Sequence, residues 1–324
     1  MGLLAALDGA NVVSLMDAYR NFVSSGATIM TASGKGLLDA RECESYAGVG
    51  PVSSSGAARD HGSIQFDLMP SNPVPLWEVT PGFARILLRS TSTPGPGIVL
   101  SDQVAEAIGR TTGDSVGTDL GSQTVSAVYD YPDDGRVPGF GWAALSVVSP
   151  SGSFDQCWVD VPSSDETLAM LPLASATSGS AGNVMLGQLN STLGAHFDIA
   201  GSIESRPSRL ASVASFLLCF LIAGAFVRSR RVELASALHI GVPKTDLVAQ
   251  VLLEYLCIAL PALSVLASGC VIFSVRLSQD EPLVLLTPLL KIVVSSLCGV
   301  VLGVIVLSAS VRERLLYRSF RDRG

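Results

Sequence analysis

Residues 210–227 have the sequence LASVASFLLCFLIAGAFV, 18 residues without a charged side chain. Two more uncharged stretches follow, residues 255–275 with 21 residues and residues 292–311 with 20. An α-helix needs about 20 apolar residues to cross the hydrocarbon core of a bilayer. Soluble proteins rarely place three such runs so close together. The sequence therefore predicts a C-terminal bundle of three transmembrane helices, with spans at about 210–227, 250–275 and 283–311.

The composition of the chain agrees with a membrane protein that has one acidic part. The 324 residues are 48% hydrophobic and 15% charged, and mean hydropathy is +0.46, whereas soluble domains are roughly 25% charged. Residues 1–205 hold 8 Lys and Arg against 21 Asp and Glu, and residues 206–324 hold 13 against 7. No basic domain stands out, which argues against a nucleic-acid partner. We expect an acidic exported domain joined to a membrane domain.

Basic residues that flank the spans predict the orientation, because Lys and Arg are retained on the cytoplasmic side. Three arginines follow the first span within residues 228–231, and five lie in the tail, residues 312–324. The loop between the second and third spans, residues 276–282, has one Arg and two acids. The segment 228–249 and the basic tail are therefore predicted to face the cytoplasm, and residues 21–205 to face the other side.

The first 20 residues do not form an ordinary export signal. MGLLAAL is short and lacks a basic flank, and Asp8 interrupts the apolar run, although export of roughly 200 residues needs a signal peptide or a preceding span. One interpretation makes residues 1–20 the outer end of a first transmembrane helix and its exit, shortened by truncation or by a misplaced start codon. The alternative is that the amino terminus is translocated together with the first span.

The exported region, residues 21–205, is expected to be a mixed α+β domain. A helix is predicted from Ser101 and Asp102, which can cap its amino end, to Gly109, which ends it. Residues 72–84 and 90–97 are expected to be connections, and from about Pro162 to Ser205 no pattern can be assigned beyond a Ser/Gly-rich loop that returns toward the membrane. Strands are predicted at residues 62–69, 84–90, 97–101, 123–131, 142–149 and 157–161.

Cysteine usage also separates the two parts. Four of the six cysteines lie in or beside the spans, and only Cys43 and Cys157 lie in the exported region. Two cysteines in an oxidising compartment indicate one disulfide, which would close a long loop. The alternative is that both are unpaired, small core residues.

Motifs for catalysis or metal binding are not recognised in the sequence. Residues 26–36 differ from a phosphate-binding loop, because Ile29 stands where Gly is needed and Gly36 where Ser or Thr is needed. His61, His196 and His239 lack metal-ligand spacing, and no GxSxG occurs. We therefore predict no catalytic, cofactor-binding or metal-binding residue, and nothing supports an enzyme in the exported domain.

Three features within the spans call for an explanation. Glu254 stands at the start of the second span, and Lys291 lies early in the third apolar stretch. Either residue could be functional, or Glu254 sits at the boundary while Lys291 extends outward or faces a partner subunit. Gly299 and Gly303 form a small-xxx-small face that permits close helix packing and hints at dimerisation.

The segment between the first two spans carries the most specific pattern. Residues 232–240 are predicted to form a short helix that ends at Gly241, and a new helix begins near Thr245 after Pro243. On physical grounds this surface helix is either a contact for a cytoplasmic partner or a passive amphipathic linker. Arg231, Glu233, Gly241 and Glu254 follow the spacing R-x-E-(x7)-G-(x12)-E.

That spacing resembles the FtsX/MacB-type (type VII) ABC transporter permeases, in which this loop is the coupling helix that docks on an ATPase subunit. Residues 97–117 and 123–132 are similar to the extracytoplasmic domain of the same family. The family has four spans, with the large domain between the first and second, whereas only the end of a first span is present here. The resemblance implies an ATPase-coupling role for Arg231, Glu233, Leu234, Leu238, Gly241, Lys244 and Glu254.

The resemblance further implies a permease subunit in a bacterial inner membrane, where it is multi-pass. It would transmit ATP-driven movement to the exported domain in export or extraction of a lipid, peptide or drug-like substrate. The implied partners are a cytoplasmic ATPase, a second permease copy or homologue, and membrane lipids, and ATP would be bound by the ATPase, not by this chain. The alternative function is a non-transporting sensor or regulator of cell-wall hydrolases.

Overall fold

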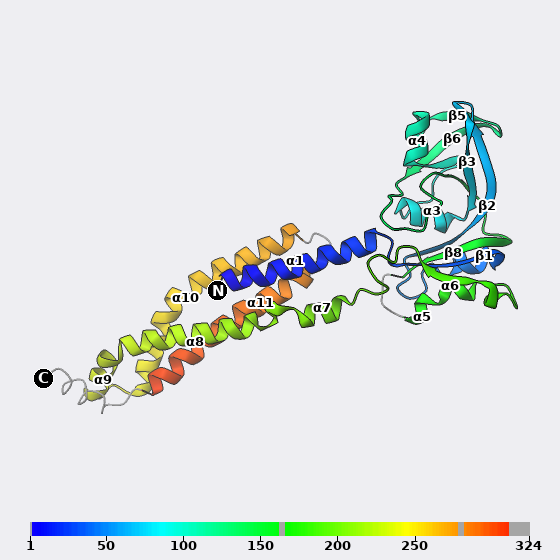
Figure 1. Ribbon diagram of the computed structural model, residues 1–324. Helices are drawn as coiled ribbons and strands as arrows, with labels where there is room; N and C mark the ends of the chain where they lie inside the picture. Colours follow the sequence, from blue (N-terminus) through cyan, green and yellow to red (C-terminus); the bar gives the residue numbers. More distant parts are fainter. Residues whose placement is uncertain (1, 162–165, 278–281, 311–324) are drawn as a thin grey trace. The chain divides into compact units, whose positions relative to one another are not determined.

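The computed structural model describes residues 2–161, 166–277 and 282–310 (Figure 1). The chain divides into two compact units, which are described separately. The membrane unit comprises Met1–Ala18 and Ile199–Gly324, and the exported unit comprises Tyr19–Asp198. The boundaries at residues 20 and 205 that we expect from the sequence stay predictions, and the basic tail 312–324 lies outside the described residues.

The described elements of the membrane unit are all helices. Three of its helices are long and apolar enough to cross a membrane, over Pro207–Ser229, Lys244–Arg276 and Leu286–Ala309. This confirms the predicted C-terminal set of three spans beside a mixed α/β domain. The elements are α1 (Gly2–Ser24), of which the residues from Tyr19 onward belong to the exported unit, α7 (Ile199–Ser205), η2 (Pro207–Leu210), α8 (Ala211–Ser229), α9 (Arg231–His239), α10 (Lys244–Leu277) and α11 (Pro282–Ala309).

Helix α1 packs into the membrane unit through its first half. Ala5 and Val12 are buried in one cluster with Cys270 of α10 and Leu289 of α11. Asp8 is only 2% exposed, and its Oδ1 accepts a hydrogen bond from Arg206 Nε at 2.9 Å. A buried carboxylate is costly unless it is paired, so this ion pair explains how the charge that interrupts the apolar run is tolerated.

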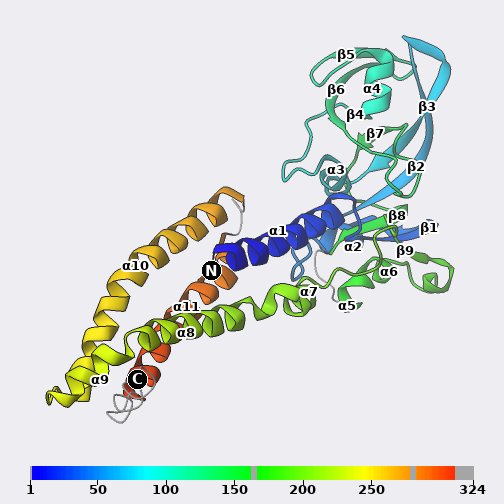
Figure 2. The ribbon, with the colours of Figure 1, turned by 60° about the vertical axis from the view of Figure 1, so that its left-hand side comes forward.

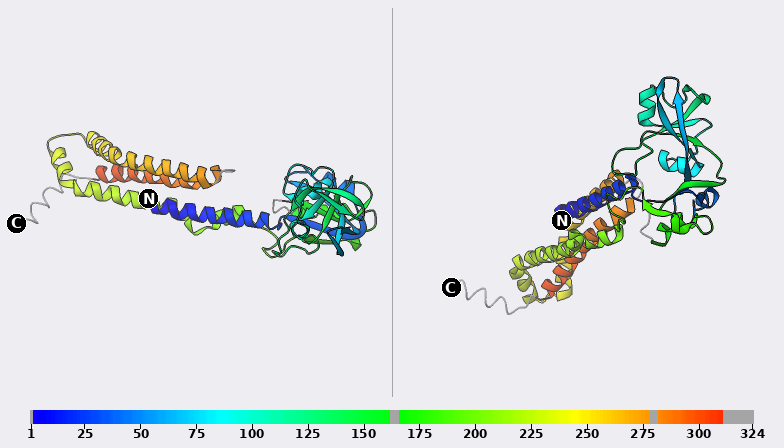
Figure 3. Two further views of the ribbon diagram at one scale, coloured as in Figure 1. Left: turned by 90° about the horizontal axis from the view of Figure 1, so that it is seen from above. Right: turned by 45° about the vertical axis from the view of Figure 1, so that its right-hand side comes forward.

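Helices α8 and α11 approach each other at two glycines of α11. A Cβ on Gly299 would overlap the carbonyl oxygen of Phe216, and a Cβ on Gly303 would lie 2.8 Å from Phe220 O. The predicted small-residue face therefore does pack closely on a helix, but that helix is α8 of the same chain. The hint of dimerisation taken from this motif is not supported, because the face is already occupied. Besides α8, helix α11 also lies alongside α10 (Figure 3).

The exported unit is built on one nine-stranded sheet with the order β3-β7-β4-β6-β5-β2-β8-β1-β9 (Figures 1 and 2). An additional pairing of β3 with β2 closes six of these strands into a ring. The strands are β1 (Ile29–Asp39), β2 (Ser54–Phe66), β3 (Met69–Val79), β4 (Ile98–Ser101), β5 (Ser115–Thr118), β6 (Gly121–Tyr129), β7 (Ala144–Val147), β8 (Ser153–Asp160) and β9 (Met185–Gln188). The helices are α2 (Ala40–Ser45), α3 (Pro81–Leu88), α4 (Asp102–Ile108), α5 (Glu166–Ala169), α6 (Leu171–Ala174) and η1 (Ala181–Asn183).

Two expectations for this unit are wrong. Residues 84–90 are not a strand but belong largely to α3, which begins after Thr80 with Pro81 in its first turn and buries Phe83, Ala84, Ile86 and Leu87. A short apolar run does not by itself distinguish a buried helix from a strand. Residues 72–84 are not a connection, because most of them form β3. The prolines of β3 lie beside an irregular stretch of its pairing with β2, where the strand tolerates a missing N–H donor.

Helix α4 forms where the sequence predicts it. Ser101 caps its amino end by accepting a hydrogen bond from Val104 N, and Gly109 ends it with φ of 61°. Cys43 of α2 and Cys157 of β8 are joined by a disulfide across a separation of 114 residues, and both are buried.

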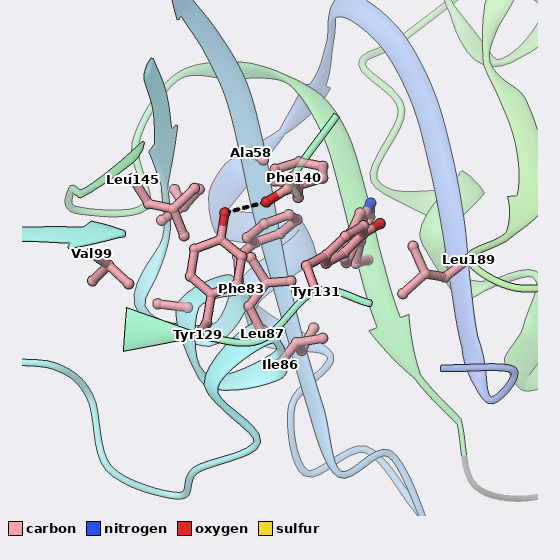
Figure 4. Packing of buried hydrophobic residues seen from close by; sticks show 13 residues of the cluster. Ala58, Phe83, Ile86, Leu87, Val99, Tyr129, Tyr131, Phe140, Leu145 and Leu189 are labelled. Carbon is pink, nitrogen blue, oxygen red and sulfur yellow. Dashed lines mark hydrogen bonds between the residues drawn. The ribbon is translucent and has the colours of Figure 1, made fainter. Parts of the chain in front are cut away.

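An aromatic cluster fills the core between α3 and the sheet (Figure 4). Phe83, Phe140 and Trp158 contact one another with ring centroids 4.5–5.3 Å apart. Tyr129 donates a hydrogen bond to Phe140 O at 2.6 Å, and its burial raises the pKa of the phenol above its ordinary value. Gly82 of α3 and Gly56 of β2 let the two backbones touch, since a Cβ on either glycine would overlap the other element. Helix α3 is thus fixed against β2.

Candidate functional site

Helix α9 lies between α8 and α10 (Figure 2), and its apolar side chains pack against both. Leu234 and Leu238 are each 8% exposed and pack in one cluster with Val227 of α8 and with Leu247 and Val251 of α10. Both leucines therefore point into the bundle. In this structure they position α9 and do not offer a surface to a partner.

The end of α9 has the geometry of a glycine terminator. Gly241 has φ of 96°, a left-handed conformation that residues with a Cβ rarely adopt. Its N–H donates to Leu238 O at 3.1 Å, and Val242 N donates to Ala237 O at 3.2 Å. These bonds satisfy the last carbonyls of the helix, and the chain turns sharply before α10 begins at Lys244.

Arg230 links α9 to α10 by two ion pairs. Its Nε donates to Glu233 Oε2 at 2.9 Å, and its Nη1 donates to Glu254 Oε2 of α10. Gln250 donates to the second oxygen of Glu254 at 3.1 Å. Glu233 and Glu254 are thus brought together by one arginine, although they are 21 positions apart in the sequence. The sequence interpretation missed Arg230, and the i, i+3 spacing of Arg230 and Glu233 was the available signal.

Arg231 and Lys244 are both exposed, and neither forms an ion pair with any residue in the described part of the chain. Arg231 lies with Arg228 at a cavity of about 440 Å³ between α8 and α11. Their predicted part in coupling stays a prediction. The seven nominated residues divide into a buried pair, a bridged acidic pair, the glycine turn and two exposed cations.

Helix α9 and the turn that follows it expose apolar side chains. Ile240 is 81% exposed, and Val232 and Val242 are also exposed. Single exposed apolar residues are common, and these three lie within 11 residues, Val232 at the start of α9 and the other two just after its end. We define Val232, Ile240 and Val242 as the α9 patch.

The anchoring role of Arg230 can be tested against its neighbour. We expect Arg230→Gln to increase amide hydrogen exchange in α9, because the links to Glu233 and Glu254 are lost, whereas Arg231→Gln is expected to leave exchange unchanged. Mass spectrometry of hydrogen exchange on the full chain in detergent measures both. Equal protection of residues 231–239 in the two variants would contradict the anchoring role.

Comparison with known proteins bears on this segment directly. Residues 208–315 match the family model described as FtsX-like permease C-terminal, which includes α9 and all three predicted spans. A search of curated proteins found no match.

Groups of three or more His, Cys, Asp or Glu that could hold a metal are absent from the residues that the structure describes.

Among the solved structures that are similar to part of the chain are two exported domains of transporters. The periplasmic region of MacB from Actinobacillus actinomycetemcomitans has 12% identity and a TM-score of 0.39, and the match covers 59% of this chain and 99% of that one. The extracellular domain of the ABC-type transporter YknZ from Gram-positive bacteria has 11% identity and a TM-score of 0.32, covering 49% and 100%. The family match to the membrane part confirms the resemblance to FtsX/MacB-type permeases that the sequence predicts.

Proposed function

We propose that this chain is the permease subunit of an ABC transporter of the FtsX/MacB type in a bacterial inner membrane. A separate cytoplasmic ATPase would dock on α9 and its turn, and the permease would act with a second permease copy or homologue. ATP would be bound and hydrolysed by the ATPase. Movement of the docked helix would pass through the membrane helices to the exported unit and drive export or extraction of a lipid, peptide or drug-like substrate.

The geometry of α9 is the observation that carries this proposal. One face of α9 is fixed to α8 and α10 by Leu234, Leu238 and the Arg230 bridge, while the α9 patch stays exposed. Force applied to the exposed side is therefore applied to the bundle. A partner can shift a conformational equilibrium only if it binds the two states with different affinity, so the ATP-bound and ATP-free ATPase must contact this segment differently.

Docking can be tested by recovery of the ATPase. The tagged full chain is extracted from its native membrane with mild detergent, and co-purifying proteins are identified by mass spectrometry through the phosphate-binding loop of an ABC ATPase. We expect Ile240→Glu to reduce recovery of the ATPase strongly, because a charge would enter an apolar contact. Leu120→Glu, at an exposed leucine of the exported unit, is the matched control and should leave recovery unchanged. Failure to recover an ATPase with the intact wild type would overturn the proposal.

Coupling makes a second prediction at Gly241. We expect Gly241→Val to reduce stimulation of the partner's ATP hydrolysis, because a β-branched residue in this left-handed conformation costs about 1–3 kcal/mol and distorts the turn. Gly241→Asn should retain most of the stimulation, since Asn tolerates the conformation better. ATPase assays on the reconstituted complex measure both variants. Normal stimulation with Gly241→Val would exclude a role for the turn in coupling.

A further inference from the structure

The exported unit contains a cavity of about 570 Å³ between the last turns of α1, helix α3 and the edges of β1, β2 and β8. This volume lies in the range of small-ligand sites. All lining residues belong to the exported unit. Part of the wall is apolar, formed by Val23, Ile29, Ile86, Leu87 and Leu189.

The cavity gathers positive charge in an acidic unit. Residues 19–198 contain eight Lys and Arg against 18 Asp and Glu. Four of those eight cations, from three separate segments, line this one cavity: Arg20, Arg85, Arg89 and Arg136. The acidic lining residue is Asp160, and both of its carboxylate oxygens accept hydroxyl hydrogen bonds, from Thr28 at 2.6 Å and Ser53 at 2.5 Å. The lining thus holds four cations against one carboxylate, and a concave surface with an excess of one sign of charge concentrates its field on a ligand of opposite sign.

Arg89 has a backbone conformation that its side chain does not favour. Its φ is 48°, and it is the one non-glycine residue with positive φ in residues 2–161, 166–277 and 282–310. It follows the last residue of α3, a position where Gly or Asn is usual. Unfavourable backbone conformations of this kind cluster at functional sites and ligand-binding sites. Here the arginine places a guanidinium at the cavity.

Arg136 and Arg85 add fixed donors to the same wall. The Arg136 side chain is 6% exposed, pairs with Asp134 at 3.2 Å and donates to Ser25 O and Ser24 O. Arg89 donates to Ser24 O as well, so two like charges share one neutral acceptor, and partial burial and Arg136 together lower the pKa of Arg89. Arg85 forms an ion pair with Glu44 at 3.6 Å, which is longer than a hydrogen bond, and its Nε has no hydrogen-bond partner among the described residues.

We propose that this cavity binds an anionic amphiphile, with a phosphate or carboxylate head group held by Arg85, Arg89 and Arg136 and an apolar chain against Ile86, Leu87 and Leu189. Arginine suits such head groups because its planar fork donates two parallel hydrogen bonds to a phosphate or carboxylate. The inference goes beyond the proposed transport function and rests on residues of the exported unit. It can hold whether or not an ATPase docks on α9.

The test uses the purified full chain in phosphatidylcholine nanodiscs, with octyl phosphate as the probe in equilibrium dialysis against empty nanodiscs. We expect saturable binding to the wild type. Arg89→Asn keeps a residue that tolerates the left-handed conformation but removes the guanidinium, and it should weaken binding by roughly tenfold or more, as expected for the loss of a charged hydrogen bond. Arg85→Gln should do the same. Arg41→Gln, at an exposed arginine outside the cavity, is the matched control and should leave binding unchanged.

Three ligands and one stability measurement decide between the outcomes. Inorganic phosphate should bind more weakly than octyl phosphate because it lacks the chain, and octyltrimethylammonium should not bind. Thermal unfolding midpoints of both cavity variants near the wild-type value would show that weaker binding is not unfolding. The proposal is overturned if octyl phosphate binds all variants equally, if the cation binds as well as the anion, or if free phosphate binds as tightly as octyl phosphate, which would leave a site for the head group alone.

Discussion

The double variant Gly299→Ala/Gly303→Ala is expected to lose much of the stability of the membrane unit, by about 1–3 kcal/mol for each added methyl group. The methyl group at Gly299 would overlap Phe216 O, and the one at Gly303 would lie 2.8 Å from Phe220 O. Both obstacles are backbone atoms of α8, so a side-chain rotation cannot relieve them. The two helices must separate and lose the close packing that stabilises helix pairs in lipid.

Thermal unfolding of the purified chain in detergent, followed by gel filtration of the surviving folded fraction, measures this loss. Gly269→Ala is the matched control, because Gly269 lies in α10 and its Cβ would meet no heavy atom within 4 Å. The control should unfold at the wild-type temperature. If the double variant did so too, α8 and α11 would not pack as closely as the structure shows.

The second large effect is expected in the exported unit, at the disulfide between Cys43 and Cys157. We expect Cys43→Ala/Cys157→Ala to reduce the free energy of unfolding by about 2–5 kcal/mol, because the open chain gains conformational freedom when unfolded. Alanine keeps both buried positions free of an unpaired polar group. The bond joins α2 to β8, so the loss should be confined to this unit.

Denaturant unfolding of the full chain, observed through tryptophan fluorescence, measures the change. The signal reports the exported unit, since the three tryptophans, Trp77, Trp142 and Trp158, all lie in it. Cys257→Ala/Cys298→Ala, at two exposed free cysteines, serves as the control and should not shift the transition. Reducing agent added to the wild type should reproduce the double alanine variant, and a transition insensitive to both would refute the stabilising role of the bond.

Several elements follow from the sequence because their causes are local. The three spans are predicted by length and hydropathy alone, since a helix must cover the hydrocarbon core. Helix α4 is predicted by Ser101 and Gly109, and the end of α9 by Gly241, because caps act within one turn. The acidic exported unit and the basic membrane unit are also distinguished by the sequence alone, because charged residues can be counted along the chain.

The candidate site at α9 is only partly predictable from the sequence, because its contacts join residues far apart in the chain. The spacing from Arg231 to Glu254 identifies the segment, but the arginine that bridges Glu233 and Glu254 is Arg230, and this depends on how α9 lies against α10. Leu234 and Leu238 are expected from the resemblance to take part in coupling, and their burial against α8 and α10 gives them a positioning role. The sequence pattern of a helix predicts which residues share a face, but it does not predict which face other helices cover.

The sequence by itself therefore determined the class of protein, its membrane spans and the segment that relates it to FtsX/MacB-type permeases. Only the tertiary structure decided that α3 is a helix, that α8 covers the glycine face of α11, and that four arginines from three separate segments line one cavity. Hydropathy, caps and spacing are set by neighbours along the chain. Helix partners and converging charges are set by residues far apart in sequence, whose contacts exist only after the chain has folded.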